Sequence, residues 1–197
     1  MTETRELTLD TGVSGKSTFI PPSTLAEYLA MPEGAPYYEF INGIAHFMAS
    51  PTTSHQECLL NLAVEMRAFV KNHQLGKVFI SPLDVYLSEE EYYQPDMLFV
   101  SNERKSIIQE RIHGAPDLVV EVLSPSNGYK DLSHKKRMYE AFDVREYWIL
   151  DPLEKSVEVL FNTENGFQIA SKAYTRGMVK SQILSGFAVD VEQLFAE

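Results

Sequence analysis

Polar and apolar positions near the start of the chain predict a short helix followed by a hairpin. A helix is expected to begin near Ser23, because Thr24 and Glu27 have the spacing of a capping box. Two β-rich runs then flank Asn42 and Gly43. An Asn-Gly pair between such runs favours a tight turn, since both residues accept positive φ.

The rest of the chain alternates between helical and extended patterns. Apolar residues recur at helical spacing from 53 to 74, and Gly76 is placed to end that helix. A second helical pattern covers 130–143, and the polar insert 101–112 has room for one more helix. The expected strands are 77–87, 92–100, 117–124, 145–150, 156–161 and 167–174, with a short closing helix at 190–195.

Strands in series with a few interposed helices favour a mixed β-sheet flanked by helices, in an α/β or α+β domain. Residues 1–20 lack apolar periodicity and are expected to form a loosely ordered arm. Residues 21–197 then form a single domain, a size that suits one hydrophobic core.

Composition limits the cellular setting and the partners. The chain has 44% apolar residues but no apolar run long enough to span a membrane, and its first residues do not resemble a signal peptide. Cys58 is the single cysteine, so we expect a reducing, cytoplasmic location.

The 28 acidic and 17 basic residues give a net charge of -11. This balance argues against bulk electrostatic binding of nucleic acid, but not against an enzyme with a local site.

Two carboxylates lie in unusual positions. The apolar run 117–123 is typical of a strand covered on both faces, and Glu121 lies in its middle. A buried carboxylate is costly unless it is protonated, paired or bound to a cation. Asp96 opens the apolar run before it, so pairing of the two strands would bring both acids together to share a proton or bind a divalent ion. Alternatively, Asp96 lies in solvent at a strand end and Glu121 pairs with an arginine.

A lysine falls within the apolar stripe of the second helix. At 100° per residue Lys135 lies inside this stripe, whereas Lys136 lies at its edge. Lys135 could extend its ammonium to water, or it could neutralise the inward carboxylates and contact a phosphate. The stripe consists of Leu132, Met138, Tyr139 and Phe142.

Three further features allow both structural and functional interpretations. His55 begins the apolar face of the first long helix, and Glu39 lies between two aromatic residues of the predicted hairpin. His55 could be a structural histidine, or it could support a site or transfer a proton. Glu39 could point inward, and on its own it is expected to be structural. The basic residues Lys130, Lys135, Lys136 and Arg137 form either a DNA-contacting surface or an ordinary solvated helix face.

A set of short motifs gives the chain a family resemblance. Together, from about residue 22 to 195, they resemble the Uma-type restriction endonuclease domains of the PD-(D/E)XK nuclease superfamily. The motifs are Tyr38-Glu39-Phe40-Ile41-Asn42-Gly43, Ser50-Pro51, His55, Pro95-Asp96, the run from Asp117 to Ser126, Asp131 with Lys135 and Tyr139, Glu146-Tyr147-Trp148-Ile149, and Asp151-Pro152.

The resemblance implies a restriction-endonuclease-like fold and a divalent-metal site. In such nucleases an Asp, a Glu and a backbone carbonyl just after the Glu hold Mg²⁺ (or Mn²⁺). The matching positions here are Asp96, Glu121 and the carbonyl of Val122. The lysine of the motif is expected two residues after the Glu, but that position is Leu123.

The resemblance also implies where the missing lysine has moved. Lys135, on the following helix, matches the displaced lysine, and the helical pattern selects the same residue independently. Glu39 matches an acid that completes the site, and His55 matches an early histidine of the family.

The expected function is Mg²⁺-dependent hydrolysis of phosphodiester bonds in DNA, with Asp96 and Glu121 holding the metal and Lys135 orienting water or stabilising phosphate charge. The alternatives are a catalytically silent interaction domain that keeps the nuclease fold, and hydrolysis of RNA or of a small phosphodiester. No membrane partner is expected, and a homodimer is plausible because many endonucleases of this fold pair to cut two strands.

Overall fold

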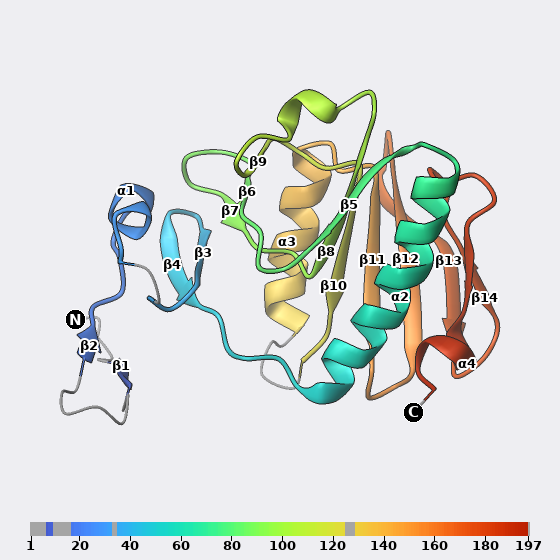
Figure 1. Cartoon of the computed structure of the whole chain (residues 1–197), viewed down its shortest axis with the longest axis horizontal. Coiled ribbons are helices and arrows are strands. Elements are labelled where there is room, and N and C mark those ends of the chain that lie inside the picture. Colours follow the sequence, from blue (N-terminus) through green and yellow to red (C-terminus); the bar gives the residue numbers. More distant parts are fainter. Residues whose placement is uncertain (1–6, 10–16, 33–34, 125–128, 197) are drawn as a thin grey trace.

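In the computed structural model, which describes residues 7–9, 17–32, 35–124 and 129–196, the centre of the fold is a six-stranded mixed sheet (Figure 1). Strand β10 runs parallel to β11, and the other neighbouring strands are antiparallel. In spatial order the strands are β13 (Gly166–Tyr174), β12 (Ser156–Thr163), β11 (Glu146–Asp151), β10 (Leu118–Val122), β8 (Met97–Ser101) and β5 (Gly76–Ile80).

A second, five-stranded sheet lies beside the first. Its order is β4 (Ile44–Phe47), β3 (Tyr38–Ile41), β7 (Tyr92–Tyr93), β6 (Val85–Tyr86) and β9 (Ile112–His113). Two small antiparallel pairs complete the strands: β1 (Leu7–Leu9) with β2 (Ser17–Phe19), and β14 (Met178–Lys180) with β15 (Ala188–Asp190).

Two long helices cover opposite faces of the six-stranded sheet (Figure 1). Helix α2 (Thr53–Asn72) packs on one face, where its buried residues join a core around Trp148 and the short closing helix α4 (Val191–Leu194). Helix α3 (Tyr129–Ala141) lies on the other face, where Tyr139 packs with Val119 and Tyr147. Side chains of α2 and of α3 can therefore reach the end of β10 from opposite faces of the sheet.

The predicted first helix and hairpin are confirmed. Helix α1 (Leu25–Leu29) is capped by Thr24, whose hydroxyl accepts from the N–H of Glu27 at 3.2 Å. Strands β3 and β4 pair around Asn42 and Gly43, which have φ of 50° and 71°. Both long helical patterns and the closing helix also form helices.

Gly76 does not end helix α2, contrary to the prediction from the sequence. The helix ends at Asn72, and Gln74 takes the left-handed conformation with φ of 53°. Gly76 instead begins β5, where a Cβ would lie 2.1 Å from the carbonyl oxygen of Val100. The glycine is needed for close approach of two strands rather than for a helix terminus.

Two predicted single strands are each divided between the sheets. The run 77–87 forms β5 and β6, and the run 92–100 forms β7 and β8. The insert 101–112 contains only a 3₁₀ turn, η1 (Lys105–Ile107), and the strand residues at its end. Strands β14 and β15 were not predicted.

The predicted N-terminal arm is only partly described. Residues 1–6 and 10–16 lie outside the described residues, and the single-domain boundary at residue 21 stays a prediction. Among the described helices, none combines the length and apolar character needed to cross a membrane.

Candidate functional site

Asp96 and Glu121 meet where strands β8 and β10 end. The antiparallel register places Val120 opposite Met97, so the next pair along the ladder is Glu121 and Asp96. The main-chain N–H of Val122 donates to Oδ2 of Asp96 at 2.8 Å. The predicted convergence of the two carboxylates is therefore present in the fold.

Lys135 lies between two buried carboxylates. It projects from α3 with 4% of its surface exposed, and its Nζ lies 2.9 Å from Oε1 of Glu39 and 3.1 Å from Oε1 of Glu121. The hydroxyl of Tyr139, one helical turn further along α3, donates to the same Glu121 oxygen at 2.7 Å. The helix thus directs an ammonium and a phenol at the carboxylate of Glu121. Of the two interpretations of Lys135, the one in which its ammonium points inward to the carboxylates is correct.

Glu39 reaches the cluster from the second sheet. It belongs to β3, is buried, and accepts from the main-chain N–H of Gln94 at 3.0 Å as well as from Lys135. Gln94 lies between β7 and β8, in the segment that passes from one sheet to the other. Glu39 is therefore held at a fixed position relative to the six-stranded sheet.

His55 contacts the cluster from helix α2. Its Nε2 lies 3.3 Å from Oδ2 of Asp96, and the buried Nδ1 has no hydrogen-bond partner among the described residues. The helix begins only two residues earlier, capped by Thr52, whose hydroxyl accepts from the N–H of His55. The N-terminal cap thus fixes the backbone from which the imidazole approaches Asp96.

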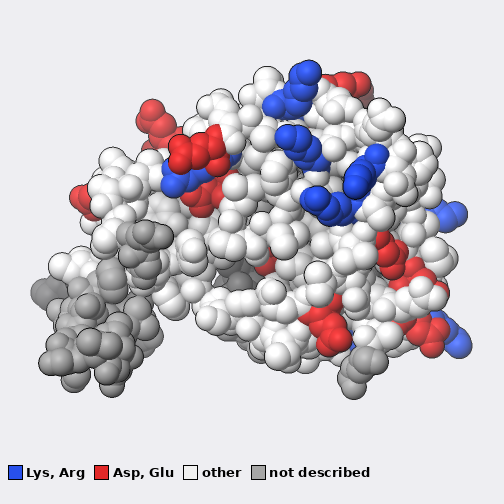
Figure 2. Space-filling model, in the orientation of Figure 1, with Lys and Arg blue, Asp and Glu red and all other residues white. Residues whose placement is uncertain are grey.

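These five side chains border one small cavity of about 130 Å³. The molecular surface is hollowed between the β3–β4 hairpin and α2, on the face shown in Figure 2. All five predicted site residues thus belong to one site. The lining is formed by Glu39, His46, Phe47, Met48, Ala49, Ser50, Pro51, His55, Ser81, Gln94, Asp96, Glu121, Val122, Ser124 and Lys135.

The charges in this cavity are unbalanced. Burial raises the pKa of Glu121 to about 8; Lys135 opposes the shift, while Asp96 and Glu39 add to it. Burial alone would lower the pKa of Lys135, but Glu121 and Glu39 raise it well above its ordinary value. One ammonium thus faces three carboxyl groups, and a further cation would favour the ionised form of Glu121.

The donor set fits a hard divalent cation. Mg²⁺ is bound by oxygen ligands, commonly one or two carboxylates with retained waters, which is what Asp96, Glu121 and the Val122 backbone offer at this cavity. Within the described part of the chain, no three Asp, Glu, His or Cys side chains form a ready-made metal cluster. Glu121 is engaged by Lys135 and Tyr139, so metal binding would require it to share or exchange these partners.

Of the four basic residues considered as a DNA-contacting surface or a solvated helix face, at least one does not lie on the surface of α3. Lys135 is buried in the ion-pair cluster, and Lys136 borders a pocket that also contains Asp151, Glu154 and Glu158. The side chain of Lys130 lies outside the described residues. This part of the helix surface is therefore no isolated positive patch.

Two supporting residues were not assigned to the site from the sequence. Gln94 contributes a main-chain N–H, which no side-chain pattern can reveal. Tyr139 was predicted as a core residue and named in a family motif with Lys135, but it was given no role in the site, although its position four residues after Lys135 places both side chains on one helix face. Helical spacing was therefore a usable signal for Tyr139.

Comparison with solved structures identifies the fold as restriction-endonuclease-like. The chain is similar to a crystal structure described as a putative nuclease belonging to DUF820 from Anabaena variabilis, with a TM-score of 0.72 and 20% sequence identity. The match covers 88% of this chain and 98% of that one. At this identity the similarity establishes the fold only.

The family follows from the sequence match. Residues 25–192 match the Uma2 family, described as "Putative restriction endonuclease", and the chain belongs to this family. A search of curated proteins finds no match. Family membership supports nuclease function in general terms, and the metal, substrate and catalytic residues are matters for proposal.

Proposed function

We propose that the protein is a divalent-metal-dependent endonuclease that hydrolyses phosphodiester bonds of DNA. The observation that carries this proposal is the meeting of Asp96, Glu121, Glu39 and Lys135 at one cavity, in a chain of the Uma2 family. Asp96, Glu121 and the carbonyl of Val122 would hold Mg²⁺ or Mn²⁺. A bound cation of this kind polarises the scissile phosphate and lowers the pKa of bound water.

Lys135 has the role of orienting water or stabilising charge on the phosphate. Its neighbours Glu121 and Glu39 keep it protonated, and an ammonium is a strong donor to phosphate oxygens or to water. The bond from Lys135 to Glu39 sets the direction of the side chain. Glu39 therefore acts as a positioning residue for Lys135.

His55 is assigned to the support of Asp96. Its Nε2 faces Oδ2 of Asp96, the same oxygen that accepts from the N–H of Val122. These two contacts limit rotation of the Asp96 carboxylate.

Two finer proposals accompany this activity. We propose a reducing cytoplasmic setting, because the free thiol of Cys58 is buried among core residues. We also propose that a homodimer cuts the two strands of a duplex. Light scattering that shows only monomer at micromolar concentration would exclude that dimer.

The direct experiment is cleavage of supercoiled plasmid and single-stranded DNA with Mg²⁺ or Mn²⁺. Wild-type protein is compared with Asp96→Asn, Glu121→Gln and Lys135→Met, and with Lys136→Met as a matched control on the same helix. We expect metal-dependent cleavage that the first three variants reduce at least 100-fold and the control retains.

Other outcomes have defined meanings. Cleavage that persists in all variants would point to a contaminating nuclease. No cleavage of either DNA would reject the proposed activity on DNA; RNA and a small phosphodiester would then be tested, and failure on these would leave an interaction domain with the nuclease fold.

A further inference from the structure

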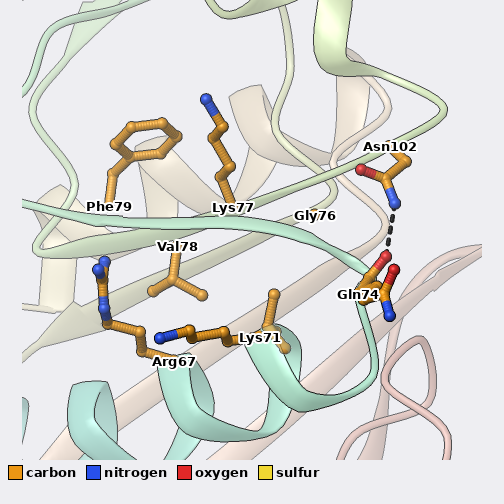
Figure 3. A pocket seen from close by; sticks show the side chains of 9 residues that line it. Arg67, Lys71, Gln74, Gly76, Lys77, Val78, Phe79 and Asn102 are labelled. Atoms are coloured by element: carbon orange, nitrogen blue, oxygen red, sulfur yellow. Dashed lines mark hydrogen bonds between the residues drawn. The ribbon is translucent and has the colours of Figure 1, made fainter.

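A second, larger pocket lies between the C-terminal part of α2 and strand β5. It has a volume of about 540 Å³. Arg67 and Lys71 extend from the helix, and Lys77 projects from the strand beside Phe79 (Figure 3). We call this the basic pocket; the residues that line it are Arg67, Val70, Lys71, Gln74, Gly76, Lys77, Val78, Phe79 and Asn102.

The basic pocket carries positive charge without local compensation. All three cations are exposed, and the lining includes no acidic residue. Among the described residues, no carboxylate lies within 4 Å of Arg67, Lys71 or Lys77. Figure 2 shows basic side chains gathered over this region of α2 and β5. This is unusual in a chain with a net charge of -11.

Stabilisation of helix α2 explains the presence of only one of these three cations. Lys71 lies in the last turn of α2, where a cation interacts favourably with the helix dipole. Arg67 lies more than one turn before the helix end, and Lys77 belongs to the next strand. In Figure 3 Lys77 points away from α2, so it lies on the opposite side of the edge strand β5 from Arg67 and Lys71. Cations on both sides of an edge strand fit an extended ligand with several negative charges.

The basic pocket is connected by the backbone to the candidate active site. Strand β5 runs from Gly76 to Ile80, and the next residue, Ser81, lines the small site cavity. The N–H of Ser81 donates to the carbonyl oxygen of Asp96 at 2.9 Å. The four residue steps from Lys77 to Ser81 span ~13 Å of extended chain.

This separation suits the backbone of a nucleic acid. Successive phosphates on one strand of a duplex are spaced ~3.4 Å along the helix axis. The distance from Lys77 to the cavity where a scissile phosphate would bind therefore corresponds to a few nucleotides of one strand. Because the positive charge is confined to one pocket, it can act locally in a protein that repels nucleic acid elsewhere.

We propose that Arg67, Lys71 and Lys77 bind backbone phosphates of a nucleic-acid strand whose scissile phosphate lies at the Asp96–Glu121 cavity. The inference rests on the proposed function and adds the surface that positions the substrate. Contacts of this kind fix the register of the strand without reading its sequence.

The test measures binding separately from cleavage. Fluorescein-labelled single-stranded and duplex 20-mers are titrated with Asp96→Asn protein in EDTA, so that no cleavage occurs. The test variant is Arg67→Glu, Lys71→Glu and Lys77→Glu together. The matched control reverses Lys155, Arg176 and Lys180, three exposed cations elsewhere on the chain, and changes the net charge equally.

We expect the test variant to weaken DNA binding at least 10-fold and to reduce the slope of log K against log salt by about 2 to 3, while the control changes both much less. Equal effects of the two variants, or no detectable DNA binding before substitution, would overturn the inference. Circular dichroism and thermal melting of both variants check that the fold is retained.

Failure of this inference is distinguishable from failure of the proposed function. Plasmid cleavage by wild-type protein that is insensitive to the three reversals would reject the basic pocket and retain the nuclease. Pocket-dependent DNA binding without cleavage by wild-type protein would retain the pocket and reject the nuclease activity.

Discussion

Nζ of Lys135 lies 2.9 Å from Oε1 of Glu39, although the two residues are 96 positions apart in the sequence. The contact joins helix α3, which covers the six-stranded sheet, to strand β3 of the five-stranded sheet. Both side chains are almost completely buried. The ion pair is therefore part of the packing between the two sheets as well as of the candidate site.

Replacing Lys135 by Met is expected to destabilise the protein. The substitution leaves Glu39 buried without its cation and removes the same partner from Glu121, and breaking a buried ion pair costs about 3–5 kcal/mol. Urea denaturation followed by circular dichroism measures the change in the free energy of unfolding. Lys136→Met, on the more exposed neighbouring position, is the control and should change it by less than about 1 kcal/mol. Equal values for the two variants would contradict the buried-pair arrangement.

Glu121 gives stability a defined pH dependence in the absence of metal. Burial, opposed by Lys135, raises its pKa from 4.5 to about 8, so the folded state favours the protonated form. This contribution is fully present below pH 4.5 and is lost as the pH rises through 8. Relative to Glu121→Gln, the wild type should therefore lose stability between pH 5 and 8, by roughly 1.4 kcal/mol for each unit of pKa shift. Urea titrations of both proteins at pH 5 and 8 measure this difference. An equal change in the free energy of unfolding of the two proteins between these pH values would contradict the prediction.

A divalent cation should stabilise the wild type. Binding to the folded state alone stabilises it by RT ln(1 + [L]/Kd), about 2.7 kcal/mol at a concentration 100 times Kd. We expect Mg²⁺ or Mn²⁺ to raise the melting temperature of the wild type more than that of Glu121→Gln. Glu154→Gln, at an exposed position, serves as the control and should respond like the wild type. Identical shifts in all three proteins would count against the site.

The thiol of Cys58 is expected to be unreactive in the folded protein. Burial raises the pKa of Cys58 to about 12, with a smaller contribution from the nearby Asp96 charge, and the thiol donates to the carbonyl of His55. Little thiolate is then present at pH 8. Reaction with a chromogenic disulfide should be slow until urea unfolds the protein. In Ser106→Cys protein a second thiol at an exposed position should react rapidly; rapid reaction of wild-type protein without denaturant would refute the expectation.

Gly76→Ala should disturb the edge of the six-stranded sheet. Its Cβ would lie 2.1 Å from the Val100 carbonyl oxygen, so backbone atoms must move at a cost of about 1–3 kcal/mol. Gly43→Asn is a suitable control, because a Cβ there has space and Asn tolerates positive φ. A thermal melt compares the variants, and an unchanged melting temperature for Gly76→Ala would reject the close approach.

The sequence predicted those features that depend on local rules. The hairpin at Asn42-Gly43 and the cap at Thr24 are local, because the turn and capping chemistry lie within a few residues. Helical spacing placed Lys135 within the apolar stripe, although it left open whether the ammonium turns to water or to the buried acids. The meeting of Asp96 and Glu121 could be predicted because each acid lies in or beside an apolar run, and the two runs were taken as neighbouring strands.

The features that escaped prediction depend on tertiary contacts. Periodicity cannot show that a run such as 77–87 changes sheets, because both halves remain extended. Gly76 lies at the expected place for a helix terminus, and only the approach of Val100 explains its real function. The basic pocket combines Arg67 and Lys71 with a strand residue, so no single segment reveals it.

The division of the site between two sheets has a mechanical consequence. Asp96 and Glu121 end adjacent strands of one ladder, so their spacing is fixed by the main-chain hydrogen bonds of that sheet. Glu39 belongs to the other sheet and reaches the cavity through Lys135 and Gln94. A small rotation of one sheet against the other would therefore redirect the ammonium of Lys135 while leaving the pair of acids undisturbed. Because Lys135 also contacts Glu121, such a rotation would change how much of that carboxylate is free to bind a cation.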